Sequence, residues 1–173
     1  LGDVEAIARS VVDFATHEVK DEKPERIDFW SLVDSIADAY PQLSFAEGSA
    51  NTRGLVCIGR PVALRRCVTN LVDNAITYGE RARLALSGDE SEIVLAIEDD
   101  GPGIPEERLE QVFRPFTRVE ASRNRQTGGF GLGLTIARTI ARGLGGEIRL
   151  ENREGGGLRT ELRLPRAAET AGS

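Results

Sequence analysis

The 173-residue chain contains no methionine, one histidine, one tryptophan and two cysteines. It also lacks an excess of basic side chains, because 22 lysines and arginines stand against 28 aspartates and glutamates and the net charge is −6. Nucleic-acid binding needs a basic surface, so this balance argues against a nucleic-acid partner. Since the chain begins at Leu1 and has no methionine, we expect a fragment or a processed chain.

Long apolar runs are missing as well. No stretch approaches the ~20 apolar residues that a bilayer-spanning helix needs, and no signal peptide is visible. We therefore expect this segment to make no direct membrane contact. Cys57 and Cys67 lack metal-ligand spacing, which indicates buried thiols in a reducing compartment. With 40% hydrophobic residues, the chain can form one well-packed domain with a short appendage.

The spacing of apolar residues predicts the secondary structure. Helical spacing is found in residues 3–19, 29–40, 62–78 and 131–144, and a short helix is expected at 106–112. Short apolar or alternating runs predict strands at residues 43–46, 54–58, 81–87, 92–98, 147–151 and 158–164. In residues 92–98 both alternating sets include apolar residues, so we expect both faces of this strand to be covered.

These elements predict an α/β (α+β) two-layer sandwich, with a mixed, mostly antiparallel sheet, helices on one face of it and an added N-terminal helix. Residues 1–23 would be the end of a helical element and a linker, 24–166 the main domain, and 167–173 a small, polar, disordered tail. Asp28 is expected to cap the helix that follows it. Trp30 is expected in the core or at a docking surface.

Residues 70–78, NLVDNAITY, carry two side-chain amides on one edge of an otherwise apolar helix. Asn70 and Asn74 are four residues apart and therefore share a face. Each amide can offer oxygen to a hard cation, or a hydrogen bond to phosphate or water. The alternative for this segment alone is two solvated asparagines.

Residues 99–104, DDGPGI, follow a buried strand. Gly101 and Gly103 have no Cβ, so the backbone can turn sharply and a flat ligand can approach it closely. A carboxylate here can accept hydrogen bonds from an exocyclic amine such as that of adenine. The alternative is an ordinary Asp-Gly turn.

Residues 128–133, GGFGLG, lead directly into a helix. Free N–H groups and the positive end of a helix dipole suit a phosphate group. The stretch is neither a Walker A loop nor a Rossmann fingerprint, because the required spacings are absent. A hinge is the alternative. The preceding residues 117–130 are polar, basic and without apolar periodicity, which is typical of a lid-like loop.

In this order, the three stretches resemble the N, G1 and G2 boxes of the ATP-binding fold shared by sensor histidine kinases, gyrase, Hsp90 and MutL, the GHKL or HATPase_c family. Residues 113–116, FRPF, resemble the F box of histidine kinases. The resemblance covers about residues 25–165. Through EDDGPGIP, FRPFTR and the closing GGL…LP it is greatest to osmosensor kinases of the EnvZ type. It implies a Bergerat-type fold that uses ATP and Mg²⁺.

The resemblance also implies residue roles. Asn74 would ligate Mg²⁺, and Asn70 would assist at the phosphates or through metal-bound water. Arg118, with Arg123 or Arg125, would reach the phosphates, so that Asn70, Asn74 and Arg118 form the catalytic set.

At the base, Tyr78 would pack beside adenine and Asp100 would fix its amino group. The other residues expected to contact the nucleotide are Gly101, Gly103, Ile104, Phe116, Thr127, Gly129, Phe130, Gly131, Leu132 and Gly133. Thr77 stands where many relatives have a basic residue, and Phe130 stands where they often have a small or polar one.

ATPases of this fold place a glutamate one turn before the metal-binding asparagine. This chain has Asn70 there, and an amide cannot act as a general base. We therefore predict a bacterial two-component sensor kinase domain that transfers the γ-phosphate to a histidine for relay to a response regulator receiver domain. The alternatives are a GHKL-fold ATPase, an anti-sigma-factor-like serine kinase and a non-catalytic nucleotide-sensing module.

His17 is the one histidine, but the Thr-Pro expected after a phosphoacceptor does not follow it. We interpret residues 1–20 as the end of the second helix of a dimerisation hairpin, with the acceptor histidine upstream of Leu1. The partners would be the protein's own hairpin domain, in a homodimer, and the response regulator. The location would be the cytoplasmic side of an inner-membrane sensor.

Overall fold

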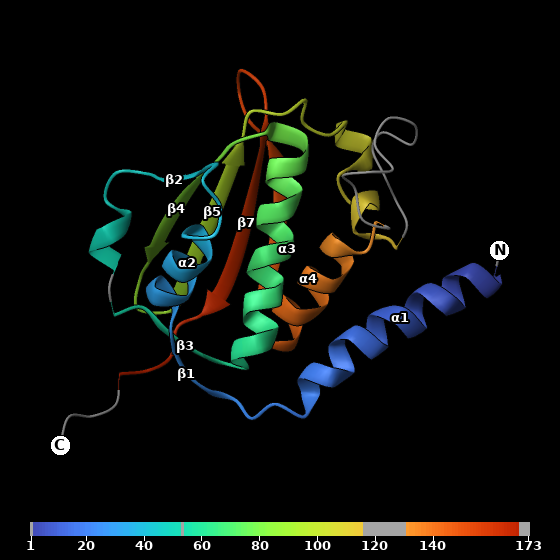
Figure 1. Ribbon diagram of the computed structural model, residues 1–173, viewed down its shortest axis with the longest axis horizontal. Helices are drawn as coiled ribbons and strands as arrows, with labels where there is room; N and C mark the ends of the chain where they lie inside the picture. Colours follow the sequence, from blue (N-terminus) through green and yellow to red (C-terminus); the bar gives the residue numbers. More distant parts are fainter. Residues whose placement is uncertain (1, 53, 116–130, 170–173) are drawn as a thin grey trace.

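The computed structural model describes residues 2–52, 54–115 and 131–169. Figure 1 shows a sheet with α2, α3 and α4 on one face and the long helix α1 extending beside α4. In chain order the elements are α1 (Gly2–Lys20), β1 (Glu25–Asp28), α2 (Phe29–Ala37), β2 (Leu43–Phe45), η1 (Ser49–Thr52), β3 (Val56–Gly59), α3 (Pro61–Gly79), β4 (Ala82–Gly88), β5 (Glu92–Asp99), η2 (Glu106–Arg108), η3 (Gln111–Phe113), α4 (Gly133–Gly143), β6 (Glu147–Asn152) and β7 (Leu158–Pro165). The predicted two-layer α/β architecture is confirmed.

The main sheet has five strands in the order β2-β4-β5-β7-β6. β2 runs parallel to β4 and the other neighbours are antiparallel, as expected for a mixed sheet. β1 is not among the predicted strands; it pairs with β3 in a separate two-stranded antiparallel sheet. Only Ile27 of this four-residue strand is buried, so β1 carries too little alternation to be recognised.

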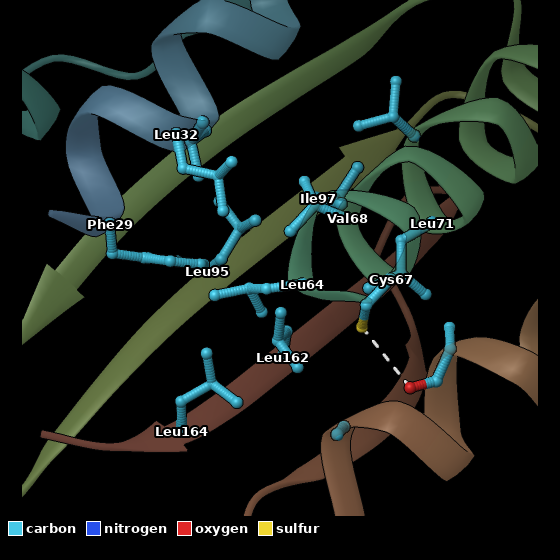
Figure 2. Close-up of a cluster of buried hydrophobic side chains, with 14 of the residues drawn as sticks. Phe29, Leu32, Leu64, Cys67, Val68, Leu71, Leu95, Ile97, Leu162 and Leu164 are labelled. Carbon is cyan, nitrogen blue, oxygen red and sulfur yellow. Dashed lines mark hydrogen bonds between the residues drawn. The ribbon is translucent and has the colours of Figure 1, made fainter. Parts of the chain in front are cut away.

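The core lies between the sheet and the helices. Figure 2 shows side chains of α2 and α3 packed over those of β5 and β7. The members labelled there are Phe29, Leu32, Leu64, Cys67, Val68, Leu71, Leu95, Ile97, Leu162 and Leu164. Cys67 donates from Sγ to the carbonyl oxygen of Ala137 (3.3 Å) and so connects α3 to α4. Trp30 packs on Phe45, with 4.9 Å between ring centroids, and contributes to this core.

Both cysteines are buried and free, as expected. Burial raises the pKa of the Cys67 thiol to about 12 and that of Cys57 to about 11. Both thiols are therefore neutral at physiological pH.

The outer face of the sheet is covered by charged side chains instead of helices. Ala96 on β5 is 1% exposed, so the expectation that both faces of this strand are covered is correct. Its cross-strand neighbour Glu161 bonds to Arg159 (2.9 Å) and Arg163 (2.9 Å). Glu98 bonds to Arg159 (2.7 Å) on the same face. Alternation along β5 and β7 thus separates an apolar inner face from an ion-paired outer one.

Several boundaries differ from the predictions. The expected helix at 106–112 is two 3₁₀ turns, η2 and η3, and α2 ends at Ala37 instead of residue 40. Two residues assigned to a disordered tail are hydrogen-bonded. Ala167 N donates to Val56 O (2.7 Å), and Ala168 O accepts from Arg26 Nη1 (3.2 Å). Asp28 caps α2, as predicted, by accepting from Ser31 N (3.1 Å).

Helix α1 is joined to the remainder of the fold by residues 21–24. Val12 is buried, whereas Val4, Ile7 and Val11 are exposed on the helix. In the linker, the Glu22 carboxylate accepts hydrogen bonds at the start of α3. No helix within the described residues has the length and apolar character to span a membrane.

Candidate functional site

The two asparagines lie on the half-buried edge of α3. Pro61 occupies the first turn of this helix, where its missing N–H costs nothing, and an apolar face anchors the helix on the sheet. Asn70 Nδ2 donates to the carbonyl oxygen of Gly133 (3.3 Å). Asn74 lies one turn further along the same face. Within the described parts of the chain, its side-chain amide makes no hydrogen bond, so it is available to a ligand.

The glycine stretch meets the asparagine helix at the start of α4. Gly133 is the first residue of α4, and a Cβ added to it would lie 4.0 Å from the Cβ of Asn70. Gly131 has a φ of 74°, a left-handed conformation that favours glycine. Leu132, between them, is half-buried. The structure therefore brings the N-terminus of an 11-residue helix to the asparagine face, an arrangement suited to phosphate.

Several predicted site residues lie outside the described residues. These are Phe116, Arg118, Thr127, Gly129 and Phe130, together with Arg123 and Arg125. Their roles remain predictions.

The acid–glycine turn follows β5 and contacts the C-terminal end of α3. A Cβ added to Gly79 would lie 2.5 Å from the Cβ of Asp99, and one added to Gly101 would lie 2.8 Å from the carbonyl oxygen of Tyr78. Both positions therefore require glycine so that the turn can pack against the helix. Tyr78 is 39% exposed at this junction.

The two adjacent acids of the turn differ in environment. Asp99 is 3% exposed, and its Oδ1 accepts from the backbone N–H of Gly101 (2.8 Å) and of Leu158 (3.3 Å). Burial raises the pKa of Asp99, and the two backbone hydrogen bonds oppose this. The Asp100 side chain is 80% exposed and pairs with Arg153 (3.0 Å). Asp99 is thus the acid that faces inward, whereas Asp100, the residue predicted to contact adenine, is exposed; the role of Asp100 stays a prediction.

A sequence signal could have distinguished them. Ile93, Leu95 and Ile97 alternate along β5 with their side chains toward the helices, and continuing the period of two places Asp99 on the same face. Asp100 comes after the end of β5, and its side chain is exposed to solvent.

A hollow of about 570 Å³ adjoins the turn at the end of α3. It is lined by Tyr78, Gly79, Glu80, Arg81, Asp100, Gly101 and Pro102. Three of the predicted site residues, Tyr78, Asp100 and Gly101, therefore border one concave surface.

Two residues, Asn152 at the end of β6 and Arg153 directly after it, are not among the predicted site residues and form hydrogen bonds with the backbone of the turn. Asn152, the last residue of β6, forms two hydrogen bonds with the backbone of Ile104. Arg153 Nη1 donates to the carbonyl oxygen of Asp99 (2.8 Å). Ile104 is buried in a small apolar cluster with Val112 and Leu158. No local signal identifies these partners, because about fifty residues separate them in the chain.

The segment before the undescribed stretch is fastened to α4. Thr135 Oγ1 donates to the carbonyl oxygen of Phe113 (2.6 Å), and the Arg138 guanidinium lies 4.3 Å from the centroid of the Phe113 ring. Arg138 also pairs with Glu110 (2.7 Å). The part of the predicted F box that is described thus packs beside the glycine-led helix.

The fold and the site define an ATP-binding domain built on one amide-bearing helix. The family described as "Histidine kinase-, DNA gyrase B-, and HSP90-like ATPase" matches residues 59–168, and the chain belongs to this family. It is 47% identical over 148 residues to the sensor histidine kinase GtrS of Pseudomonas aeruginosa, a match that covers 84% of this chain and 30% of GtrS. The chain thus spans less than a third of the length of this relative.

Solved structures agree with this assignment. The ATP-binding domain of PrrB from Mycobacterium tuberculosis matches with a TM-score of 0.65 and 28% identity, covering 85% of this chain and all of that one. The histidine kinase domain of the E. coli osmosensor EnvZ matches with a TM-score of 0.61 and 27% identity, covering 86% of this chain and 92% of that one. The predicted resemblance to sensor histidine kinases is confirmed.

Proposed function

We propose that this chain is the catalytic domain of a two-component sensor kinase that transfers the γ-phosphate of ATP to a histidine on a dimerisation hairpin. The observation that carries the proposal is that the start of α4 contacts the middle of α3, while the turn after β5 contacts the C-terminal end of α3. Gly133 contacts Asn70, and Asp99 contacts Gly79. Gly79 lies nine positions after Asn70, which is about 14 Å along a helix axis. That span suits a nucleoside triphosphate lying along α3.

At the adenine end, we assign recognition of the exocyclic amine to Asp99. Its Oδ1 is engaged by two backbone N–H groups. Within the described residues its Oδ2 accepts no hydrogen bond, which leaves an acceptor of fixed direction for the amine. Asp100 is exposed and paired with Arg153, and both features disfavour it for this role.

At the phosphate end, Asn74 supplies the amide oxygen that would hold Mg²⁺. The half-buried position of Asn74 and its lack of a partner within the described residues fit a ligand of this kind. Bound there, Mg²⁺ would neutralise phosphate charge. Asn70 and the N-terminus of α4 would orient the phosphates, and Arg118 would approach from the loop. Asn70 cannot act as a general base, which disfavours direct hydrolysis.

Helix α1 supports the proposed partnership with a hairpin. Val4, Ile7 and Val11 form an exposed apolar stripe of the kind that packs against another helix. We therefore keep residues 1–23 as the end of a dimerisation hairpin and its linker, followed by the catalytic domain. The homodimer, the upstream acceptor histidine, the response regulator and a location on the cytoplasmic side of an inner-membrane sensor are parts of the same proposal.

Titration calorimetry with ADP and Mg²⁺ tests the nucleotide site. We expect the wild-type chain to bind. Asp99→Asn should weaken binding by about tenfold, the equivalent of one lost hydrogen bond to a charged group. Asp100→Asn should leave affinity within about twofold, since an exposed side chain loses little on neutralisation. The reverse order would return the amine role to Asp100, and absence of wild-type binding would refute the proposal as a whole.

A second experiment tests the chemistry. The chain should not label itself with radioactive ATP, but should label a separately expressed hairpin domain that carries an acceptor histidine. Phosphohistidine is labile in acid, whereas phosphoserine is stable. Acid-stable label would favour the serine-kinase alternative, and nucleotide binding without transfer would favour a nucleotide-sensing module.

A further inference from the structure

We infer that Asn152 is a positioning residue for adenine recognition, which acts through the acid–glycine turn without touching the nucleotide. This inference rests on the proposed function. It is carried by the contacts between the end of β6 and the turn that follows β5. These contacts fix both ends of a segment whose two glycines would otherwise leave it free to move.

Asn152 binds the far end of the turn with both atoms of its amide. Oδ1 accepts from the N–H of Ile104 (2.8 Å), and Nδ2 donates to the carbonyl oxygen of the same residue (2.6 Å). The Asn152 side chain therefore forms the two hydrogen bonds that the backbone of a neighbouring strand would otherwise form. It satisfies both the N–H and the C=O of Ile104. An alanine at position 152 leaves both groups of Ile104 without these partners.

Gly103 shows how tightly the amide fits. Its φ is +73°, and a Cβ added there would lie 2.5 Å from Asn152 Oδ1. The absence of a side chain at Gly103 thus lets the amide approach the backbone. The contact is specific to an amide of this length, because one further methylene would carry the group past Ile104.

The near end of the turn is held by the residues that follow Asn152. Arg153 Nη1 donates to the carbonyl oxygen of Asp99 (2.8 Å), and Leu158 N donates to Asp99 Oδ1 (3.3 Å). A Cβ on Gly157 would collide with the same carbonyl oxygen, so this glycine also permits close packing. One hairpin, between β6 and β7, therefore fixes both Asp99 and Ile104.

The direction of the Asp99 carboxylate depends on this clamp. Its Oδ1 also accepts from Gly101 N (2.8 Å), a residue inside the turn. Release of Ile104 frees Gly101 and Gly103 to sample other backbone conformations, which weakens the bond that orients the carboxylate. Hydrogen bonding to an adenine amine requires a fixed acceptor direction. Loss of Asn152 should therefore weaken recognition of the amine more than binding of the phosphates.

The test compares two nucleotides across three forms of the whole chain: wild type, Asn152→Ala and the control Glu151→Ala. The control removes an exposed side chain from the neighbouring position of β6. The probes are ADP and purine riboside 5′-diphosphate, which lacks the exocyclic amine. We expect Asn152→Ala to weaken ADP binding by about tenfold, as for one lost directed hydrogen bond. Binding of the purine analogue should change by less than about twofold, and the control should match wild type for both probes.

The outcomes are separable. If wild type binds neither nucleotide, the proposed function fails. If wild type binds ADP and Asn152→Ala binds it equally well, or loses affinity for both probes to the same extent, the positioning role fails. Amide hydrogen exchange at Ile104 provides an independent measurement, since the Ile104 N–H should lose protection in the variant. Should Asn152→Ala fold poorly, Asn152→Asp retains the acceptor for the Ile104 N–H and replaces the donor by a charged carboxylate oxygen that the Ile104 carbonyl oxygen repels, and it should show the same selective loss for ADP.

Discussion

Replacing Glu22 by alanine removes the carboxylate that covers the first turn of α3. The first four residues of this helix, 61–64, differ in whether each has a backbone N–H group that needs a hydrogen-bond acceptor. Pro61 has none, and Leu64 N already donates to Arg60 O (2.9 Å). Val62 N lies 3.0 Å from both carboxylate oxygens of Glu22, and Ala63 N lies 3.4 Å from Oε1. The N-cap residue of α3, Arg60, makes no capping hydrogen bond with its side chain, and the carboxylate of Glu22, about forty positions earlier in the chain, takes this role instead.

The magnitude follows from two contributions. Loss of an N-cap side chain costs about 1 kcal/mol. Loss of a negative charge beside the helix N-terminus costs about 0.5 kcal/mol at a partly exposed site. We therefore expect Glu22→Ala to lower the free energy of unfolding by about 1.5 kcal/mol, a fall in Tm of about 3–6 °C for a chain of this size. Glu22→Gln keeps an acceptor oxygen and should lose about half as much.

Urea unfolding followed by circular dichroism measures the effect. The matched control is Asp21→Ala, which makes the same change in charge at an exposed neighbouring position. We expect the order of stability to be Asp21→Ala, close to wild type, then Glu22→Gln, then Glu22→Ala. Equal losses for Asp21→Ala and Glu22→Ala would show that net charge, and not the cap, is responsible. An unchanged midpoint for Glu22→Ala would refute the capping argument.

Three further predictions concern stability. Burial raises the pKa of Asp99 above its ordinary 3.8, so ionisation of this side chain destabilises the folded state as pH rises through the folded-state pKa. Asp99→Asn should therefore raise the urea midpoint at pH 7 and leave it unchanged below pH 3.8. The hydrogen bond from Arg83 lowers the pKa of Glu98 below 4.5, so Glu98→Gln should lower the midpoint above pH 4.5, and this difference should vanish as pH falls through the lower folded-state value. Leu95 is fully buried, and Leu95→Ala should cost about 2–5 kcal/mol in the same assay; a cost under about 1 kcal/mol would contradict its place in the core.

The sequence alone predicted the main helices and strands because their patterns are local. Apolar residues at helical spacing identify α3 and α4, and strict alternation identifies β6 and β7. The asparagine pair and the two glycine stretches were recognisable because helix geometry and the absence of a Cβ act within a few residues. Their order along the chain was enough to identify the family.

One signal in the sequence bears on the choice between the two adjacent acids. The alternation of β5 places Asp99 inward, and for this reason we propose Asp99, in place of the predicted Asp100, as the acid that contacts adenine. Asp99 and Asp100 have the same side chain and differ in burial. Asp99 is 3% exposed, whereas the side chain of Asp100 is 80% exposed.

Tertiary structure decided the contacts between distant residues. Glu22 reaches α3 across forty residues, and Asn152 reaches Ile104 across forty-eight. The parallel pairing of β2 with β4 and the antiparallel pairing of β1 with β3 are also contacts between residues that are distant in the chain. Propensity and periodicity act over one or two turns of chain, whereas these partners meet because a sheet and its helices must pack together. The sequence determined which elements form and which motifs they carry, and packing determined which side chains hold the motifs in place.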